Sequence, residues 1–191
     1  MPMKPEVTEE KIILGIDPGT NNMGVGVIAC RKENIRVVAM DVLKLEKLSD
    51  HALKLERIFN TVLRSIDAFH PDELAIESPF YGKNVQSMLK LGRAQGVAIA
   101  AALHRKIPVF EYSPRKIKQS ITGKGGASKE QVASMLYRIL QIEGVPDNLD
   151  ITDALAVALC HHYQGDRSAG SGKAYSGWKA FLSKHPERLS R

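Results

Sequence analysis

An apolar run that ends in one acidic residue constrains this chain more than any other feature. Residues 11–17 have the sequence KIILGID, and Pro18 and Gly19 follow at once. A short apolar run bounded by proline and glycine is typical of a strand that is buried on both faces. Asp17 therefore ends a core strand, where a carboxylate needs a metal ion, a basic side chain or a helix N-terminus opposite it.

Two interpretations of Asp17 compete. The Asp-Pro-Gly sequence is ideal for a turn on backbone grounds alone. Gly24 and Gly26 lie in the next apolar segment, where glycine weakens a strand but lets a ligand or another backbone approach closely. A metal-binding cleft beside Asp17 explains both features, and we favour it over a simple turn.

The length of 191 residues predicts one domain with a substantial core. The sequence has no run of eighteen apolar residues and no N-terminal signal pattern, so we expect a cytoplasmic protein without membrane contact. Cys30 and Cys160 are far apart in the sequence, and we expect them to be buried free thiols.

Positive charge is concentrated in the middle of the chain. The whole sequence has a net charge of +6. Residues 81–130 contain ten basic and two acidic side chains, a net charge of +8, so the remainder carries −2. A basic segment of this kind is typical of a polyanion-binding face, and a solvated charged surface is the alternative.

Apolar periodicity and turn residues predict an α/β fold with a five-stranded mixed sheet flanked by helices. The first three strands form an antiparallel meander, and the fourth returns parallel to the first after a crossover helix. We expect a disordered lead-in at 1–10, a domain at 11–163 and a flexible basic tail at 164–191. The predicted strands are 11–17, 23–31, 35–43, 72–77 and 107–112, and the predicted helices are 49–69, 84–105, a basic helix after Ser113, 128–142 and 149–163.

Four carboxylates stand where chemistry is expected: Asp17, Glu77, Asp150 and Asp153. Asp17 and Glu77 end two parallel strands, at the sheet edge where α/β proteins bind ligands. Asp150 and Asp153 are three residues apart on one helix face. Clustered carboxylates suit Mg²⁺ or Mn²⁺, and two such ions can act on a phosphodiester. The alternatives are a helix-dipole role for Asp150 and an exposed strand end for Glu77.

Aromatic and basic residues flank these acids. Phe80 and Tyr81 lie in a Pro-Phe-Tyr-Gly loop, where they can stack on an unpaired base or pack in a core or interface. Lys124 in a glycine loop and Lys129 at the start of the next helix can reach phosphates. The adjacent pair His161-His162 points to different helix faces, which argues against a zinc site.

Five motifs in this order resemble the RuvC family of crossover-junction endonucleases. The resemblance covers residues 11–163 and includes the sequence ILGIDPGT at 13–20. The other four motifs are LAIE at 74–77 with Phe80 and Lys83-Asn84, LGRAQGVA at 91–98, PVFEY at 108–112 and DITDALA at 150–156. Thr20 stands where serine is common in the family, and the tail with Trp178 follows no family pattern.

The resemblance implies a ribonuclease-H-like fold, a homodimer and Mg²⁺-dependent paired nicking of four-way (Holliday) junctions in DNA recombination and repair. It implies two Mg²⁺ per active site, with Mn²⁺ as a substitute, and a partnership with the RuvA–RuvB branch-migration complex. By position, Asp17, Glu77, Asp150 and Asp153 match the family's catalytic and metal-binding acids. Phe80 matches the aromatic that contacts bases near the junction, and Lys118 and Lys129 fall where the family has basic residues near the scissile phosphates. With Tyr81, Lys83 and Lys124, these are the expected DNA-binding residues.

Two other functions are open to such a sequence. The Asp-Pro-Gly-Thr turn also resembles the phosphate loop of actin-like ATPases, but these need two such domains and the chain holds one. A DNA-binding module without nuclease activity would share the fold, and the four acids argue against it. A stripe of small residues, Gly92, Gly96 and Ala100, can pack against the mate in a homodimer or against the chain's own sheet.

Overall fold

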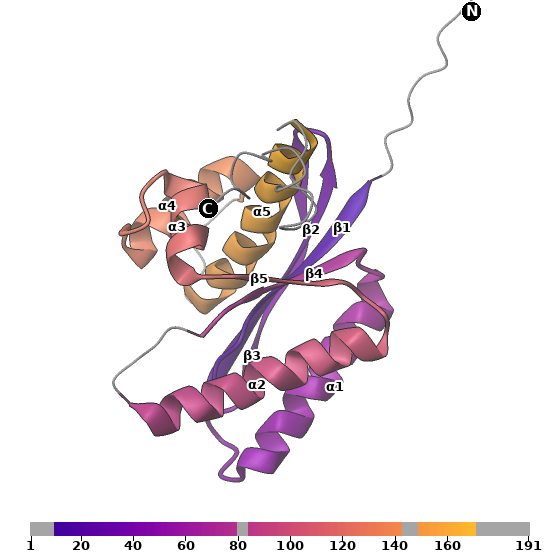
Figure 1. The fold of residues 1–191 in the computed structure, drawn as a ribbon, viewed down its shortest axis with the longest axis vertical. Helices are drawn as coiled ribbons and strands as arrows, with labels where there is room; N and C mark the ends of the chain where they lie inside the picture. Colours follow the sequence, from indigo (N-terminus) through magenta and orange to yellow (C-terminus); the bar gives the residue numbers. More distant parts are fainter. Residues whose placement is uncertain (1–9, 80–83, 143–148, 171–191) are drawn as a thin grey trace, which may run out of the picture.

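The computed structural model describes residues 10–79, 84–142 and 149–170, with the backbone alone at 149–150 and 166–170. Five strands form one mixed sheet in the order β3-β2-β1-β4-β5 (Figure 1). The first three strands are antiparallel neighbours, and β4 and β5 run parallel to β1, as predicted. The strands are β1 (Lys11–Asp17), β2 (Asn22–Arg31), β3 (Asn34–Lys44), β4 (Glu73–Glu77) and β5 (Val109–Tyr112).

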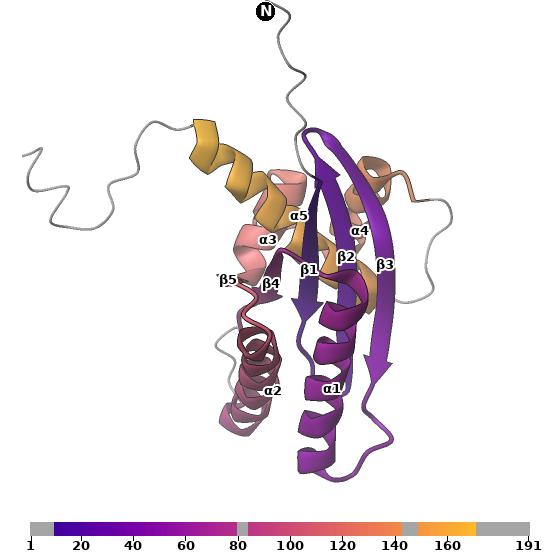
Figure 2. The same ribbon diagram turned by 90° about the vertical axis from the view of Figure 1, so that its right-hand side faces the viewer.

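Helices cover both faces of this sheet (Figure 2). The helices α1 and α2 pack on one face, while α3, α4 and α5 lie on the other. Each helical layer encloses its own apolar core against the sheet, so β1, β2 and β4 are buried on both sides. The helices are α1 (His51–Phe69), α2 (Val85–His104), α3 (Pro114–Thr122), α4 (Lys129–Leu140) and α5 (Leu149–Gly170).

The helix starts follow from local sequence. Ser113 accepts a hydrogen bond from the backbone N–H of Lys116, and Pro114 occupies the first position of α3. Ser128 and Gln131 form the predicted capping box of α4 through reciprocal side-chain and backbone hydrogen bonds. These caps fix where the two basic helices begin, and they confirm the start signals in the sequence.

Helix α5 lies directly on β1 and β2 because glycines on these strands leave room for its backbone. A Cβ atom added at Gly15 would lie 2.2 Å from the carbonyl oxygen of Ala154, and one at Gly26 would lie 2.9 Å from the backbone nitrogen of Leu155. Gly15 and Gly26 face each other across the two strands. Of the two neighbours expected at Gly26, a ligand or another backbone, the structure shows the backbone of α5.

Two element boundaries differ from the prediction for identifiable reasons. Strand β5 begins at Val109 because the Ile107 N–H bonds to the end of α2 and Pro108 has no N–H to donate. Helix α5 continues to Gly170 instead of ending at Tyr163. A single glycine such as Gly165 lowers helix stability by about 1 kcal/mol, which is not enough to end a helix whose preceding turns are buried against the sheet.

The cysteine prediction is confirmed, since Cys30 and Cys160 are both buried thiols that form no disulfide within the described residues. Within the described residues, none of the helices combines the length and apolar character that crossing a bilayer requires.

Candidate active site

Three carboxylates from three separate elements line one pocket. Ile16 of β1 pairs with Ile76 of β4, so Asp17 and Glu77 leave the sheet at the same edge. Asp153, near the start of α5, joins them in a pocket of about 260 Å³. The pocket is also lined by Lys118, Lys129, Pro114, Ile117, Val132 and Ala156.

The position of Asp153 depends on the contact between α5 and the glycines of the sheet. Ala154, the next residue, has its carbonyl oxygen against Gly15, two residues before Asp17. The role of Gly15 was not predicted from the sequence. A glycine within an apolar core strand weakens that strand, and it often marks a place where another backbone comes close.

Two lysines bring positive charge to the pocket. The Nζ atom of Lys129 lies 2.6 Å from Oδ2 of Asp153, with 55% of the lysine side chain exposed against 18% for the aspartate. Lys118 donates a hydrogen bond of 2.8 Å to the carbonyl oxygen of Ala127, in the loop between α3 and α4. Both ammonium groups are therefore held at the pocket by contacts within the chain.

Glu77 is an acid of the pocket with a strongly raised pKa. Burial, and next the negative charge of Asp153, raise the pKa of Glu77 to about 7, while Lys129 and Lys118 act in the opposite direction. The ionised form of Glu77 is destabilised by burial and by repulsion from Asp153, and an added cation would relieve that repulsion.

The chemistry of the pocket fits Mg²⁺ or Mn²⁺. Three carboxylates provide oxygen ligands alone, which these ions prefer over nitrogen or sulfur. As the described side chains stand, no three acidic, histidine or cysteine groups are clustered tightly enough to hold a metal ion. The Lys129 ammonium supplies the neutralising charge at Asp153 in this arrangement.

The remaining predicted site residues fall in three groups. Asp150 lies three residues before Asp153 in α5, and its side chain lies outside the described part of the structure. Lys124 is exposed in the loop after α3 and does not line the pocket. Phe80, Tyr81 and Lys83 lie outside the described residues.

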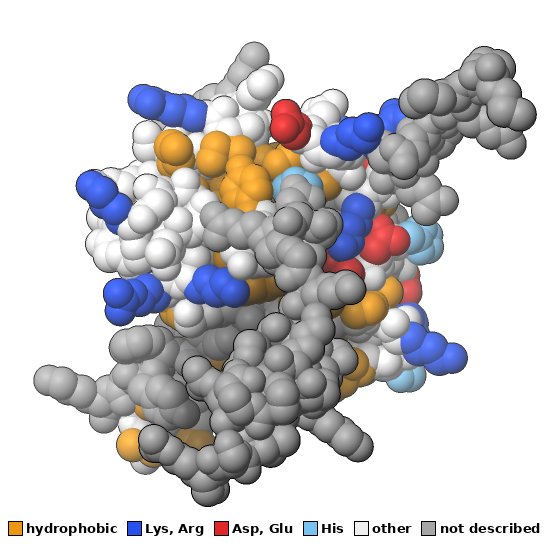
Figure 3. All heavy atoms as spheres, turned by 45° about the horizontal axis from the view of Figure 1, so that its top comes forward, with side chains coloured by type: hydrophobic (Ala, Val, Ile, Leu, Met, Phe, Trp, Pro, Cys, Tyr) orange, Lys and Arg blue, Asp and Glu red, His pale blue; other side chains and the backbone are white. Residues whose placement is uncertain are grey.

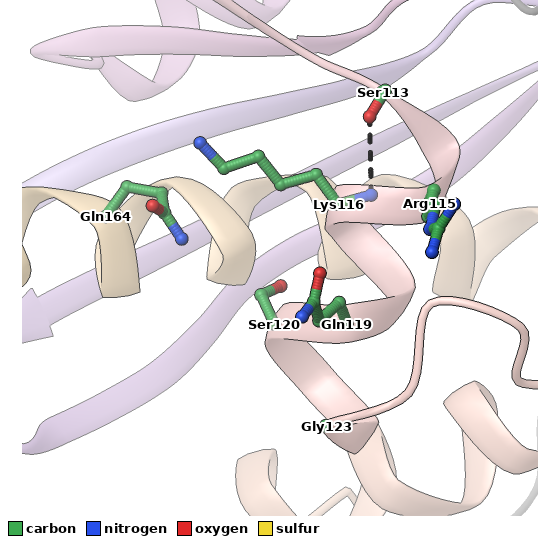
Figure 4. Close-up of a pocket in the computed structure, with 7 residues that line it drawn as sticks. All are labelled: Ser113, Arg115, Lys116, Gln119, Ser120, Gly123 and Gln164. Atoms are coloured by element: carbon green, nitrogen blue, oxygen red, sulfur yellow. Dashed lines mark hydrogen bonds between the residues drawn. The ribbon is translucent and has the colours of Figure 1, made fainter.

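A second hollow lies on the opposite side of α3 from the pocket of the acids (Figure 4). Its volume is about 470 Å³, and its only charged lining residues are Arg115 and Lys116. The other lining residues are Ser113, Gln119, Ser120, Gly123 and Gln164. On the face shown in Figure 3, the left-hand part over α3 and α4 shows Lys and Arg side chains and no acidic ones. Helix α3 therefore presents positive charge on two sides.

The sequence of this chain matches a protein family and several of its members. Residues 13–161 match the family model of crossover junction endodeoxyribonuclease RuvC. The chain is 57% identical to the RuvC of Bacteroides fragilis over 183 residues, which covers 95% of this chain and 97% of the relative. It is 54% identical to the RuvC of Cytophaga hutchinsonii, over 95% of this chain and 90% of the relative.

The fold also matches a solved structure. Thermus thermophilus RuvC in complex with a Holliday junction substrate superposes with a TM-score of 0.77 and 32% sequence identity. The match covers 83% of this chain and 96% of that one. This likeness confirms the predicted ribonuclease-H-like fold.

Proposed function

Because the chain belongs to the RuvC family of crossover junction endodeoxyribonucleases, we propose that it resolves four-way DNA junctions in recombination and repair by Mg²⁺-dependent hydrolysis of two opposite strands. The observation that carries the proposal is the pocket that unites Asp17, Glu77 and Asp153 with two lysines. A cleft with carboxylates for a metal and cations for a phosphate is the arrangement that phosphodiester hydrolysis requires.

The acids and the lysines of the pocket have different tasks. Asp17, Glu77 and Asp153, together with Asp150, would hold two Mg²⁺, for which Mn²⁺ would substitute. When bound, these ions stabilise the negative charge that develops on the phosphate. Lys118 and Lys129 orient the scissile phosphate through charge-assisted hydrogen bonds. For that contact, Lys129 exchanges its bond with Asp153 for one with the DNA.

Affinity for the junction comes mainly from basic residues outside the reacting centre, since phosphate contacts dominate DNA binding. Lys83, Lys124, Arg115 and Lys116 would take this role. Phe80 and Tyr81 would stack on bases at the branch point, where pairing is interrupted. Support for junction binding as such comes from the relative of known structure, Thermus thermophilus RuvC, which is bound to a Holliday junction substrate.

The outer face of α2 supports the proposed homodimer. Apolar and small residues recur along it at alternating spacings of four and three, the pattern of a helix that packs against another helix. Val85 is 65% exposed, and Leu89 and Leu103 are each 58% exposed. A Cβ atom added at Gly92 or Gly96 would meet no atom of the described residues within 4 Å. Among these residues the two glycines do not pack on the chain's own sheet, so this face is open to the helix of a mate.

A charged substitution in this stripe tests the dimer. Gly96→Glu should convert the protein to a 21.0 kDa monomer in sedimentation at micromolar concentration, because the interface would bury an unpaired charge. Ser134→Glu, at an exposed position of α4, introduces the same charge and should leave the dimer intact. A wild-type protein that sediments as a monomer and still cuts both strands would contradict the dimer.

The family resemblance also supports a partnership with the RuvA–RuvB branch-migration complex in the cytoplasm. Co-sedimentation of the purified protein with a RuvA–RuvB–junction complex tests that partnership. A shift of the protein into the complex is expected, and a protein that stays separate from the loaded junction would contradict it.

Cleavage assays test the proposed chemistry. The protein should cut a synthetic four-way junction in the presence of Mg²⁺, and spare a linear duplex and an RNA–DNA hybrid. Asp17→Asn, Glu77→Gln and Asp153→Asn should each abolish cutting while junction binding in EDTA persists, since affinity depends on the cations. Asp41→Asn, on the exposed side of β3, is the matched control. Binding without Mg²⁺-dependent cutting by the wild type would indicate a DNA-binding module instead.

A further inference from the structure

Four polar side chains form a network that joins the elements carrying the proposed active site. Tyr112 Oη lies 2.6 Å from Nδ1 of His161. Nε2 of the same histidine contacts the carboxylate of Glu73, and Lys11 Nζ lies 2.6 Å from Oε2 of Glu73. We refer to Lys11, Glu73, Tyr112 and His161 as the buried polar network, since its centre, His161, is only 5% exposed.

Two members of the network begin the strands that the catalytic acids end. Lys11 is the first residue of β1, whose last residue is Asp17. Glu73 is the first residue of β4, whose last residue is Glu77. The network therefore ties together the starts of the two strands whose ends enter the pocket.

The other two members connect the same strands to the helices of the site. His161 lies on α5, eight residues after Asp153. Tyr112 pairs with Glu77 across β4 and β5, and its carbonyl oxygen accepts a hydrogen bond of 2.8 Å from the Ser78 N–H. The residue after Tyr112 caps α3, the helix that carries Lys118.

A neutral imidazole satisfies both hydrogen-bond partners of the central histidine. Burial acts to raise the pKa of Glu73, but the bonds from Lys11 and His161 outweigh it and hold the pKa below its ordinary value, so Glu73 accepts only. Burial raises the pKa of Tyr112 to about 12, so its O–H remains a donor. Burial also lowers the pKa of His161, so the ring is neutral, with Nε2–H donating to Glu73 and Nδ1 accepting from Tyr112.

The glycine contact and the network restrain α5 in different ways. Close packing of Gly15 on Ala154 brings α5 against the sheet. Apolar contact is non-directional, so it defines the rotation of α5 about its axis and its position along the sheet only weakly. Hydrogen bonds are directional, and those of His161 act more than two turns further along the same helix. Phe110 stacks on the imidazole with ring centroids 4.4 Å apart, which fixes the plane of the ring.

We propose that Lys11, Glu73, Tyr112 and His161 are positioning residues, which set the place of Asp153 relative to Asp17 and Glu77 by fixing α5 on the sheet. The inference rests on the proposed metal-binding role of the three acids. None of the four residues lines the pocket, so they act on the reaction only through the elements that they join.

Two nearly isosteric substitutions test the network. Tyr112→Phe removes one hydroxyl, and Glu73→Gln removes one charge while keeping an oxygen that accepts from His161. The readouts are Mn²⁺ affinity of the DNA-free protein by electron paramagnetic resonance, kcat and KM for junction cutting, and the melting temperature. Tyr137→Phe is the matched control, because the buried Tyr137 hydroxyl has no hydrogen-bond partner among the described residues.

Both network variants should bind Mn²⁺ about tenfold more weakly and cut with a kcat about tenfold lower, as expected from a small displacement of a ligand. KM and junction affinity in EDTA should stay at wild-type values, because the cations are untouched. The double variant should lose no more Mn²⁺ affinity and kcat than the more impaired of the two single variants, since both substitutions act through His161. Tyr137→Phe should behave as wild type.

Folded network variants with wild-type Mn²⁺ affinity and kcat would overturn the inference, whatever their melting temperature. A variant that fails to fold leaves the other single variant to decide, and failure of both to fold would assign the network to folding and overturn the proposed role. Asp153→Asn separates this result from the proposed site itself. If Asp153→Asn retains wild-type Mn²⁺ affinity, the metal site is misassigned. If it loses affinity while Tyr112→Phe does not, only the positioning role fails.

Discussion

The ammonium of Lys129 lies 2.6 Å from a carboxylate oxygen of Asp153, so the first residue of α4 neutralises an acid of α5 at the centre of the proposed metal site. The same lysine acts to lower the pKa of Glu77, which burial and the charge of Asp153 raise. The charge of Lys129 is therefore shared by two acids that arrive from different elements. A metal that binds these acids competes with this lysine.

Removing Lys129 should leave the two acids to repel each other more strongly. In Lys129→Met, we expect the pKa of Glu77 to rise above its value of about 7, because one of the charges that lower it is lost. Carbon-13 NMR of the glutamate carboxyl groups in EDTA measures this pKa. Lys124→Met, outside the pocket, is the control and should leave it unchanged. An unaltered Glu77 titration in Lys129→Met would show that this ion pair does not persist in solution.

The raised pKa of Glu77 predicts how stability depends on pH. Folded protein keeps the Glu77 proton up to about pH 7, while the unfolded chain loses it near the ordinary value of 4.5. The free energy of unfolding therefore decreases as the pH rises from 4.5 to about 7. Above pH 7, where Glu77 is ionised in both states, the decrease is complete.

Glu77→Gln should therefore stabilise the metal-free protein at pH 8, by at most about 3 kcal/mol. The gain should fall to about 1 kcal/mol or less at pH 5, which lies only half a unit above the ordinary pKa of 4.5, and vanish below pH 4. Urea denaturation in EDTA at both pH values measures the difference. Added Mg²⁺ should stabilise the wild type more than the variant. Equal effects of the substitution at both pH values would contradict the raised pKa.

A methyl group at Gly15 should displace α5. In Gly15→Ala the new Cβ atom would lie 2.2 Å from the carbonyl oxygen of Ala154, and such overpacking lowers the free energy of unfolding by about 1–3 kcal/mol or more. Junction cutting should fall further than stability alone explains, since Asp153 moves with the helix. Thermal unfolding and kcat together provide the measurement.

Gly165→Ala is the control for that substitution on the same helix. Among the described residues, a Cβ atom added there meets no atom within 4 Å. Alanine in place of a helical glycine should raise the free energy of unfolding by about 0.5–1 kcal/mol and leave kcat unchanged. A Gly15→Ala protein as stable and active as Gly165→Ala would refute the close approach of helix and sheet.

Lys118 should contribute to affinity through one phosphate. Lys118→Ala should weaken binding to all DNA sequences alike and reduce the slope of log affinity against log salt by roughly 0.9. Fluorescence anisotropy over a salt series in EDTA measures that slope. Arg64→Ala removes an exposed cation from α1, on the other face of the sheet, and should leave the slope unchanged. The same slope for Lys118→Ala and wild type would place Lys118 away from the DNA.

The sheet could be predicted from the sequence because its information is local. The apolar runs ending at Asp17 and Glu77 mark core strands, and the short polar breaks between the first three strands permit antiparallel hairpins. The parallel return of β4 beside β1 follows from the crossover helix between them. These two features alone predict that Asp17 and Glu77 lie at one edge of the sheet.

The contacts that fix α5 could not be predicted, because they join residues far apart in the chain. Nothing near His161 in the sequence indicates that its partners are Glu73 and Tyr112, which lie 88 and 49 residues away. Gly15 carried a usable signal, but a glycine shows only that something approaches and does not identify α5. The bond between Lys129 and Asp153 likewise depends on how α4 and α5 pack, a tertiary relationship without a local pattern.

Cleavage of a supercoiled plasmid that extrudes a cruciform tests the central claim most directly, because the product shows how the two strands are cut. Two coordinated nicks in opposite strands convert the plasmid to a linear molecule, whereas independent nicks first accumulate an open circle. With wild-type protein and Mg²⁺, linear plasmid should form without an open-circle intermediate, and Asp153→Asn should form neither. Open circles as the main wild-type product, or linear product from Asp153→Asn or in EDTA, would contradict a paired, metal-dependent resolvase built on this pocket.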